Sequence, residues 1–221
     1  MIKVFKNIIN NNKDYNSYLV YNENNEAILI DDSMIADEII DWCTKNNIII
    51  TDILITHNHF DHIYELEKFV KKYNSIIHIN FNDVEGLFDA NINLSAIRNE
   101  INNWQLNREY IGNVKSFMFK NEMKINNFDI VICPMGGHTP GTTFYFFKNE
   151  KMIFVGDTLF RNGYGYRENI PRVNTESFDK SIEFIYANFD NTVKIYPGHN
   201  ESGFTLEQAQ DNLKAKALFE K

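Results

Sequence analysis

The sequence predicts an α/β protein. Runs of β-branched and aromatic residues alternate with amphipathic stretches in which apolar residues recur at helical spacing. The strand-like runs dominate the middle of each half of the chain, and no Pro/Gly-rich or charged linker separates two parts. We therefore expect a single domain, residues 1–221, in which helices cover sheets.

The first half of the chain supplies five predicted strands and two long predicted helices. The strands are Ile2–Phe5, Ser17–Tyr21, Ala27–Ile30, Ile48–Ile55 and Ile76–Ile79. Met34–Lys45 is a predicted helix capped by Ser33, because hydroxyl side chains accept hydrogen bonds from the first free N–H groups. Asp61–Lys72 is a second helix with its apolar residues on one face. Between residues 80 and 113 only Val84–Phe88 and Ile97–Leu106 look helical.

The second half repeats this alternation. Its predicted strands are Lys115–Phe119, Phe128–Cys133, Thr142–Phe147, Met152–Val155 and Thr192–Tyr196. The turn Lys148–Lys151 makes two of them a predicted hairpin. Glu176–Ala187 and Leu206–Leu218 are the predicted helices, which completes a set of strands with helices between them.

Composition excludes several classes of function. The 221 residues are 43% hydrophobic and 24% charged, as in ordinary globular proteins, and the formal charge is −8. An acidic chain without a basic block is a poor candidate for nucleic-acid binding. No apolar run reaches the ~18 residues of a membrane span. With no signal-peptide pattern and only Cys43 and Cys133, we expect a cytoplasmic protein with small-molecule partners, and its oligomeric state stays open.

The six histidines are unevenly placed. Three lie within the six residues from His57 to His62, and two more, His138 and His199, stand beside glycine-containing turns. His78 lies inside a predicted strand and is expected to be an ordinary packed residue. Five of the six histidines are therefore candidates for a shared chemical role.

The first histidine cluster, residues 57–62, follows a predicted buried strand and opens a helix. Residues i and i+2 of an extended chain point the same way, so His57 and His59 can face one ion. Asp61 and His62 fall where the chain turns into the helix and can aim at a neighbouring point. Three imidazoles and a carboxylate are ligands that suit zinc, iron or manganese.

Three later candidate ligands share one layout, just past a predicted strand and next to glycine. They are His138 in Gly137-His138-Thr139-Pro140-Gly141, Asp157 in Gly156-Asp157-Thr158, and His199 in Pro197-Gly198-His199. Glycine permits tight turns and close approach of the backbone. One such turn indicates little, but four strand ends that each present a metal-competent side chain predict one site.

The combined pattern His-x-His-x-Asp-His, Gly-His-Thr-Pro-Gly, Gly-Asp-Thr-Leu-Phe and Pro-Gly-His resembles the metallo-β-lactamase superfamily. Within it, the chain is most similar to the glyoxalase II-like hydrolases. The resemblance implies a four-layer αββα sandwich with a metal site at one edge of the two sheets. It also implies two divalent ions, with zinc favoured and iron or manganese as alternatives: His57, His59 and His138 would hold one, Asp61, His62 and His199 the other, and Asp157 would bridge both.

The implied reaction is hydrolysis of a small thioester of the hydroxyacyl-glutathione type. A hydroxide that bridges the two ions would attack the carbonyl, and a metal would stabilise the developing oxyanion. Asp61 and Asp157, with this hydroxide, are the implied catalytic residues. The leaving thiolate is itself a good metal ligand, which fits this substrate class.

Substrate recognition is expected from the loop Arg161–Arg172. Its residues Arg161, Tyr164, Tyr166 and Arg167 could clamp an anionic substrate, although a solvated loop with aromatic packing explains them equally well. Glyoxalase II usually has a basic residue where this chain has Tyr166, so recognition of glutathione stays open.

Other functions remain in competition. Asp157 argues against a true β-lactamase, because that family usually lacks this bridging carboxylate. An iron-dependent persulfide dioxygenase of the same fold would hold its iron with His57, His138 and Asp157, and lactone hydrolysis is a third chemistry for the same site. A non-catalytic scaffold is disfavoured because every ligand is intact. Cys133 lies five residues before His138, but for it and for Cys43 a buried structural thiol is favoured.

Overall fold

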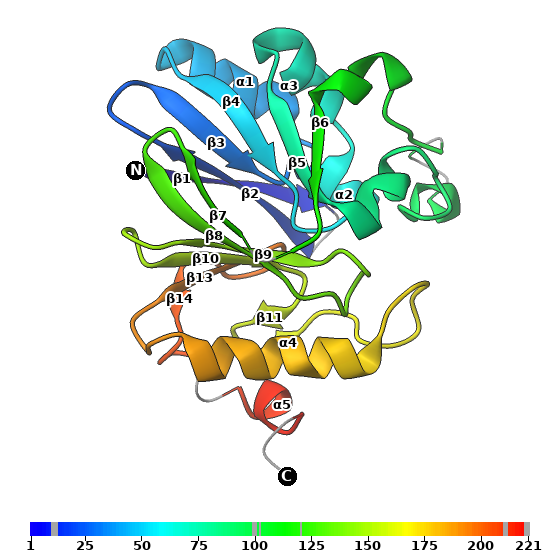
Figure 1. Ribbon diagram of the computed structural model, residues 1–221, viewed down its shortest axis with the longest axis vertical. Coiled ribbons are helices and arrows are strands. Elements are labelled where there is room, and N and C mark those ends of the chain that lie inside the picture. The colour runs from blue at the N-terminus through cyan, green and yellow to red at the C-terminus, as the bar shows by residue number, and fades with distance from the viewer. Residues whose placement is uncertain (10–12, 99–100, 102, 120, 210–211, 219–221) are drawn as a thin grey trace.

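Two six-stranded sheets lie face to face in the computed structural model, which describes all residues except 10–12, 99–100, 102, 120, 210–211 and 219–221 (Figure 1). The first sheet has the order β1-β2-β3-β4-β5-β6, made of Ile2–Ile9, Lys13–Tyr21, Glu26–Ile30, Ile49–Leu54, Ile76–Asn80 and Val114–Phe117. The second has the order β14-β13-β10-β9-β8-β7, made of Phe204–Thr205, Lys194–Pro197, Met152–Gly156, Thr143–Phe147, Phe128–Pro134 and Asn121–Ile125. A small ribbon pairs β11 (Leu159–Phe160) with β12 (Gly163–Tyr164).

Helices cover the outer face of each sheet, which gives the predicted αββα order of layers (Figure 1). On the first sheet lie α1 (Ala36–Lys45) and α3 (Leu66–Tyr73), with the short α2 (Phe60–Ile63) at its edge. On the second lies α4 (Thr175–Asn188), followed by the short α5 (Leu213–Lys216). Three 3-10 segments, η1 (Phe81–Leu87), η2 (Ser95–Ile97) and η3 (Arg108–Asn113), connect β5 to β6.

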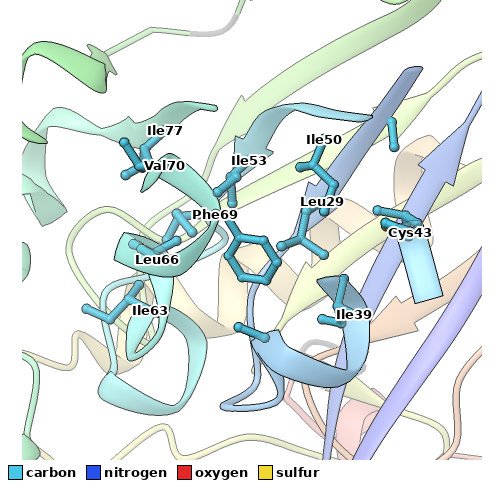
Figure 2. Packing of buried hydrophobic residues seen from close by; sticks show 14 of the residues in the cluster. Leu29, Ile39, Cys43, Ile50, Ile53, Ile63, Leu66, Phe69, Val70 and Ile77 are labelled. Carbon is cyan, nitrogen blue, oxygen red and sulfur yellow. The ribbon is translucent and has the colours of Figure 1, made fainter. Parts of the chain in front are cut away.

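Alternating side chains of the inner strands build separate apolar cores. In β3, Leu29 packs under the helices of the first sheet, as Figure 2 shows, while Ile28 and Ile30 face the second sheet. In β8, Ile130 faces the first sheet and Val131 faces α4. This period of two is what a strand buried on both faces requires.

Strand direction brings the candidate ligands to one edge. In the first sheet β3, β4, β5 and β6 run parallel. In the second, β8 and β10 are both antiparallel to β9 and therefore run the same way, and β13 is parallel to β10. The carboxyl ends of β8, β10 and β13 thus meet at a common edge, where ligand sites of open sheets form.

Four predictions of local structure are wrong in detail. Ser33 does not cap α1: Ser33 has a positive φ of 46°, and the helix begins after Ile35 without a side-chain cap. The helix predicted over Asp61–Lys72 is divided into α2 and α3. The described part of Ile97–Leu106 is not helical beyond η2, and among the described residues of Leu206–Leu218 only α5 is an α-helix.

Among the described residues, no helix combines the length and the apolar character needed to cross a bilayer.

Candidate metal centre

The loop after β4 places four candidate ligands at the edge of the first sheet. His57 and His62 are fully buried, and His59 is only 7% exposed. His59 is extended, with φ −67° and ψ 146°, and directly precedes α2, which carries Asp61 and His62. The backbone thus changes from extended to helical between the pair His57 and His59 and the pair Asp61 and His62.

The second sheet supplies the other three candidates from the ends of β8, β10 and β13. His138, Asp157 and His199 follow these strands in chain order. A Cβ at Gly198 would lie 2.3 Å from Asp157 Oδ1 and 2.5 Å from His62 Cε1, so only glycine allows this turn to approach the centre. At Gly137, φ is +108° and a Cβ would meet the Phe178 backbone at 2.6 Å, so glycine is required there as well.

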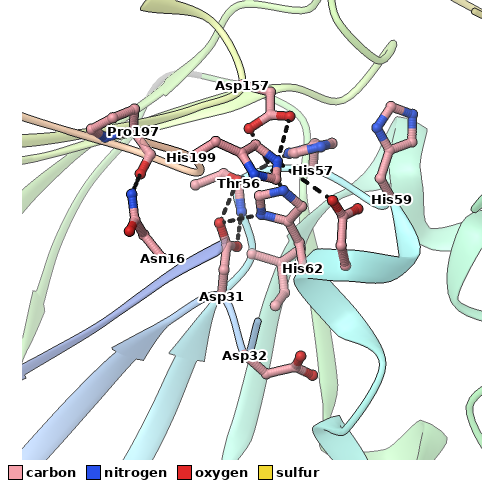
Figure 3. Close-up of polar contacts among 12 residues, drawn as sticks. Asn16, Asp31, Asp32, Thr56, His57, His59, His62, Asp157, Pro197 and His199 are labelled. Carbon is pink, nitrogen blue, oxygen red and sulfur yellow. Dashed lines mark hydrogen bonds and ion pairs between the residues drawn. The ribbon is translucent and has the colours of Figure 1, made fainter. Parts of the chain in front are cut away.

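Six of the seven side chains form two neighbouring triads, and a third group, His57, His62 and Asp157, joins them. Ligand atoms of His57, His59 and His138 lie within 4.8 Å of one another, and so do those of Asp61, His62 and His199. His59 Nδ1 and His138 Nε2 are 3.0 Å apart, and His199 Nε2 lies 3.4 Å from Asp61 Oδ2. Figure 3 shows His57, His62, Asp157 and His199 turned toward one another. We call these groups the imidazole triad and the mixed triad.

Asp157 stands between the two triads. Its Oδ2 lies 3.8 Å from His138 Nε2 in the imidazole triad and 3.0 Å from His199 Nε2 in the mixed triad. Its Oδ1 lies 3.7 Å from His62 Nε2. One carboxylate therefore reaches both groups, as a bridging ligand must.

The ring nitrogens that point away from the centre are held by other groups. His138 Nδ1 lies 2.8 Å from the carbonyl of Tyr166, and His199 Nδ1 lies 3.1 Å from the carbonyl of Asp14. His62 Nδ1 lies 2.8 Å from Asp31 Oδ2. Contacts of this kind fix the ring orientation and leave Nε2 for a metal.

Asp31 organises this loop and was not found by sequence analysis. Besides His62, its carboxylate accepts hydrogen bonds from the Thr56 backbone N–H at 2.9 Å and from Thr56 Oγ1 at 2.7 Å (Figure 3). Thr56 Oγ1 in turn lies 3.1 Å from His57 Nδ1. The only signal in the sequence was its position directly after a predicted strand, the layout shared by the recognised ligands.

Asp83 is a second organising carboxylate that the sequence did not reveal. It accepts hydrogen bonds from the Asn58 backbone N–H at 3.1 Å, from Thr139 Oγ1 at 2.6 Å and from the Gly141 N–H at 2.8 Å. It therefore ties the loop that carries His57 and His59 to the loop that carries His138.

The turn that carries His199 is clasped by β2 of the other sheet. The Asn16 side chain donates to the Pro197 carbonyl at 3.0 Å, and the Asn16 backbone N–H donates to the Gly198 carbonyl at 2.8 Å. The Tyr15 ring packs edge-on against His199 with centroids 4.9 Å apart. Both sheets thus position the last candidate ligand.

Unpartnered atoms show that the centre fits a cation. Among the described residues, His57 Nε2, His62 Nε2 and Asp157 Oδ1 are buried without a hydrogen-bond partner. Leaving a buried polar atom unpaired costs about 1–3 kcal/mol, so three together require another explanation. Imidazole and carboxylate donors that converge in this way suit first-row divalent ions.

The two triads have opposite electrostatics. Burial lowers the pKa of His59 to about 3 and also holds the pKa of His57 and His138 below the ordinary value. Burial also opposes protonation of His62, but the carboxylates of Asp31 and Asp61 outweigh it and raise the pKa of His62 to about 9. Asp157 and Asp61 raise the pKa of His199 well above its ordinary value, again against burial.

A pocket of about 880 Å³ opens over the centre. Its lining includes His59, Asp61, His138, Asp157 and His199. Apolar side chains of Phe60, Leu94, Ile97, Phe160 and Ile170 form much of the remaining wall. A volume of this size accommodates a small-molecule substrate.

Three of the four predicted substrate-binding residues line the pocket. Tyr164, Tyr166 and Arg167 line the pocket, whereas Arg161 is not part of its lining. The Arg167 guanidinium donates to both carboxylate oxygens of Asp179, at 2.9 and 2.7 Å, and Arg161 pairs with Glu201. Their role in substrate binding stays a prediction, but both charges already have partners.

The remaining histidine and the cysteines lie outside the triads. His78 is buried in β5 and its Nε2 lies 2.7 Å from Asp52 Oδ1, which confirms the packed strand residue. Cys43 and Cys133 are buried thiols, as predicted, in the two outer cores. Burial raises the pKa of Cys43 to about 12.

Several known proteins are similar to this chain in sequence. Residues 13–89 match the model of the metallo-β-lactamase superfamily. A probable metallo-hydrolase of Streptococcus pyogenes is 27% identical over 91% of this chain and 85% of its own length. A protein of Francisella philomiragia named hydroxyacylglutathione hydrolase is 28% identical over 87% of this chain and 65% of its own.

A solved structure agrees on the fold. The crystal structure of the B3 metallo-β-lactamase BLEG-1 superposes with a TM-score of 0.84 at 23% identity, covering 96% of this chain and 97% of that one. At this identity the likeness concerns the fold alone. Residues 13–89 thus carry a metallo-β-lactamase superfamily domain, and the two relatives, together with the His/Asp cluster at the sheet edge, support a metal-dependent hydrolase of this superfamily.

Proposed function

We propose that the protein is a binuclear metal-dependent thioesterase that hydrolyses small thioesters of the hydroxyacyl-glutathione type. The observation that carries the proposal is Asp157, whose carboxylate lies between two triads of buried ligands. The similarity to a protein named hydroxyacylglutathione hydrolase supports the substrate class.

The residues that would hold the two ions are those of the sequence prediction. His57, His59 and His138 would hold one, Asp61, His62 and His199 the other, with Asp157 shared; zinc is the favoured metal. Such a pair of ions lowers the pKa of a coordinated water toward neutrality and polarises the carbonyl that is attacked.

The protein's own residues would prepare this chemistry. Asp31 holds the His62 ring, and the carbonyls of Tyr166 and Asp14 hold His138 and His199, so little reorganisation accompanies the reaction. Phe60 and Phe160, on the pocket wall beside the centre, exclude water from the acyl group of a bound thioester.

The decisive experiment measures metal content and turnover in the same preparation. Protein loaded with zinc is expected to contain two ions per chain and to hydrolyse S-lactoylglutathione or a simple acyl thioester. Absence of turnover with every thioester, in protein shown to contain metal, would contradict the proposal. One iron per chain with oxygen consumption on glutathione persulfide would instead identify the dioxygenase.

A further inference from the structure

One cationic side chain on the pocket wall has no anionic partner among the residues that the structure describes. Arg98 follows η2 and is exposed at the pocket, and among the residues that the structure describes no carboxylate lies within ion-pair distance of it. In a chain of net charge −8, an arginine that faces a binding pocket without a counter-charge is a feature that requires a reason.

The other charges on this wall are already compensated. Arg167 is bound to Asp179 through two parallel hydrogen bonds and also pairs with Glu168 at 2.7 Å. Asp61 and Asp157 face the histidines of the metal centre. Arg98 is therefore the uncompensated charge of the described pocket lining.

The position of Arg98 is supported by the aromatic ring beneath it. Its guanidinium carbon lies 5.7 Å from the centroid of Phe60, the residue between the candidate ligands His59 and Asp61. A guanidinium above an aromatic face is held by a cation–π interaction but keeps its N–H donors free. The Arg98 side chain thus lies at the pocket next to the candidate metal ligands, and the contact with Phe60 does not use its N–H donors.

We propose that Arg98 is a specificity-determining residue that binds an anionic oxygen group, a carboxylate or a phosphate, of the thioester substrate. The inference rests on the proposed thioesterase function and names its substrate class as anionic thioesters. The planar guanidinium matches such groups with two parallel hydrogen bonds. Leu94 and Ile97, beside Arg98 on the wall, would contact the apolar part of the same molecule.

Arg108 offers a matched control. Its guanidinium carbon also lies over an aromatic ring, 5.2 Å from the centroid of Phe88, but it does not line this pocket. Substitution of either arginine by glutamine removes one positive charge and one cation–π contact. Only the change at Arg98 should alter the binding of an anion in the pocket.

The test compares one substrate with and without its free carboxylates. For S-lactoylglutathione, R98Q should raise KM by about 10- to 100-fold, the range for a charge-assisted hydrogen bond, with kcat nearly unchanged. For the diethyl ester of the same thioester, which has no free carboxylate, the change should be less than about twofold. With S-lactoylglutathione, R98K should recover part of the loss. Acetyl-coenzyme A, run alongside, shows whether a phosphate replaces the carboxylate.

A binding measurement separates this inference from the proposed reaction. S-hexylglutathione, a thioether that cannot be hydrolysed, should bind R98Q about 10-fold more weakly than it binds wild type or R108Q in calorimetry. If wild-type protein hydrolyses thioesters but R98Q affects the free acid and its diethyl ester equally, the role of Arg98 is wrong and the thioesterase proposal stands. If no thioester is hydrolysed, equal binding of the thioether by wild type and R98Q rejects Arg98 as well, whereas a selective loss retains it.

Discussion

The imidazole triad consists of three rings with no carboxylate among its members, whereas the mixed triad combines Asp61 with two rings. Burial keeps the first set neutral, as the pKa of about 3 for His59 indicates. In the mixed triad nearby carboxylates raise the pKa of His62 to about 9. A cation thus meets free lone pairs at one triad and must displace protons at the other.

This difference shows that two neighbouring metal-binding triads in one pocket can differ in the pH dependence of cation binding. The two triads are built by the same loop after β4 and by strand ends of the same sheet, so their fold positions are equivalent. What separates them is the number of carboxylates within reach. We expect four experiments to test this comparison, and they are ordered by the size of the effect.

Substitution of Asp157, the carboxylate shared by the two triads, should impair both of them. D157A is expected to lower metal content at both triads and to reduce turnover by more than the ~100- to 1,000-fold that loss of a single oxyanion donor costs. Elemental analysis and thioester hydrolysis measure the two effects. D37A, at a surface carboxylate paired with Lys68, is the control and should change neither. Full activity of D157A would contradict the bridging role.

The pH dependence of metal binding should differ between the triads. At pH 7 a proton on His62 must leave before a cation binds, so affinity at the mixed triad should fall by up to about 10-fold per pH unit and per proton from pH 9 downward. At the imidazole triad it should stay level to far lower pH. Zinc titrations of H59A and H199A, each of which disables one triad, measure the two profiles, and identical profiles would refute the comparison.

The residue that orients His62 should act on one triad only. D31N is expected to weaken metal binding at the mixed triad by about 10- to 100-fold, as is typical when the partner of a ligating histidine is lost. Stoichiometry at limiting zinc should fall toward one ion per chain while the imidazole triad stays filled. Equal losses at both triads would mean that Asp31 supports the whole loop through Thr56 instead.

The smallest effect is expected from the carboxylate that ties the loops of the imidazole triad. In D83N the new amide group would face the N–H of Asn58 or Gly141, which costs about 1–3 kcal/mol in the free energy of unfolding. Urea denaturation of metal-free protein measures this, with D37A again as control. No loss of stability would show that the backbone holds these loops without Asp83.

The sequence predicted the fold class and the convergence of the seven candidate ligands. Both depend on patterns that are local in the chain: apolar runs that end in His or Asp beside glycine. Parallel strand ends then meet by topology, so His138, Asp157 and His199 could be grouped before any coordinates were known.

Other features depend on contacts between distant residues and could not be predicted. Asp31 and Asp83 are short acidic side chains without a local motif, and their partners are 25 or more residues away. In the described part of Ile97–Leu106 the expected helix does not form beyond η2, and the Asn93 side chain donates hydrogen bonds to the Gly86 and Trp104 carbonyls. Such side-chain bonds compete with helical ones and override propensity.

The clasp between β2 and the His199 turn has a consequence for the biosynthesis of the protein. Asn16 leaves the ribosome well before its partners Pro197 and Gly198, because Pro197 follows it by 181 residues. During translation the histidine cluster of residues 57–62 is exposed long before His138, Asp157 and His199 exist. The complete ligand set therefore forms only after His199 has left the ribosome, so the two triads become complete at a late stage of synthesis.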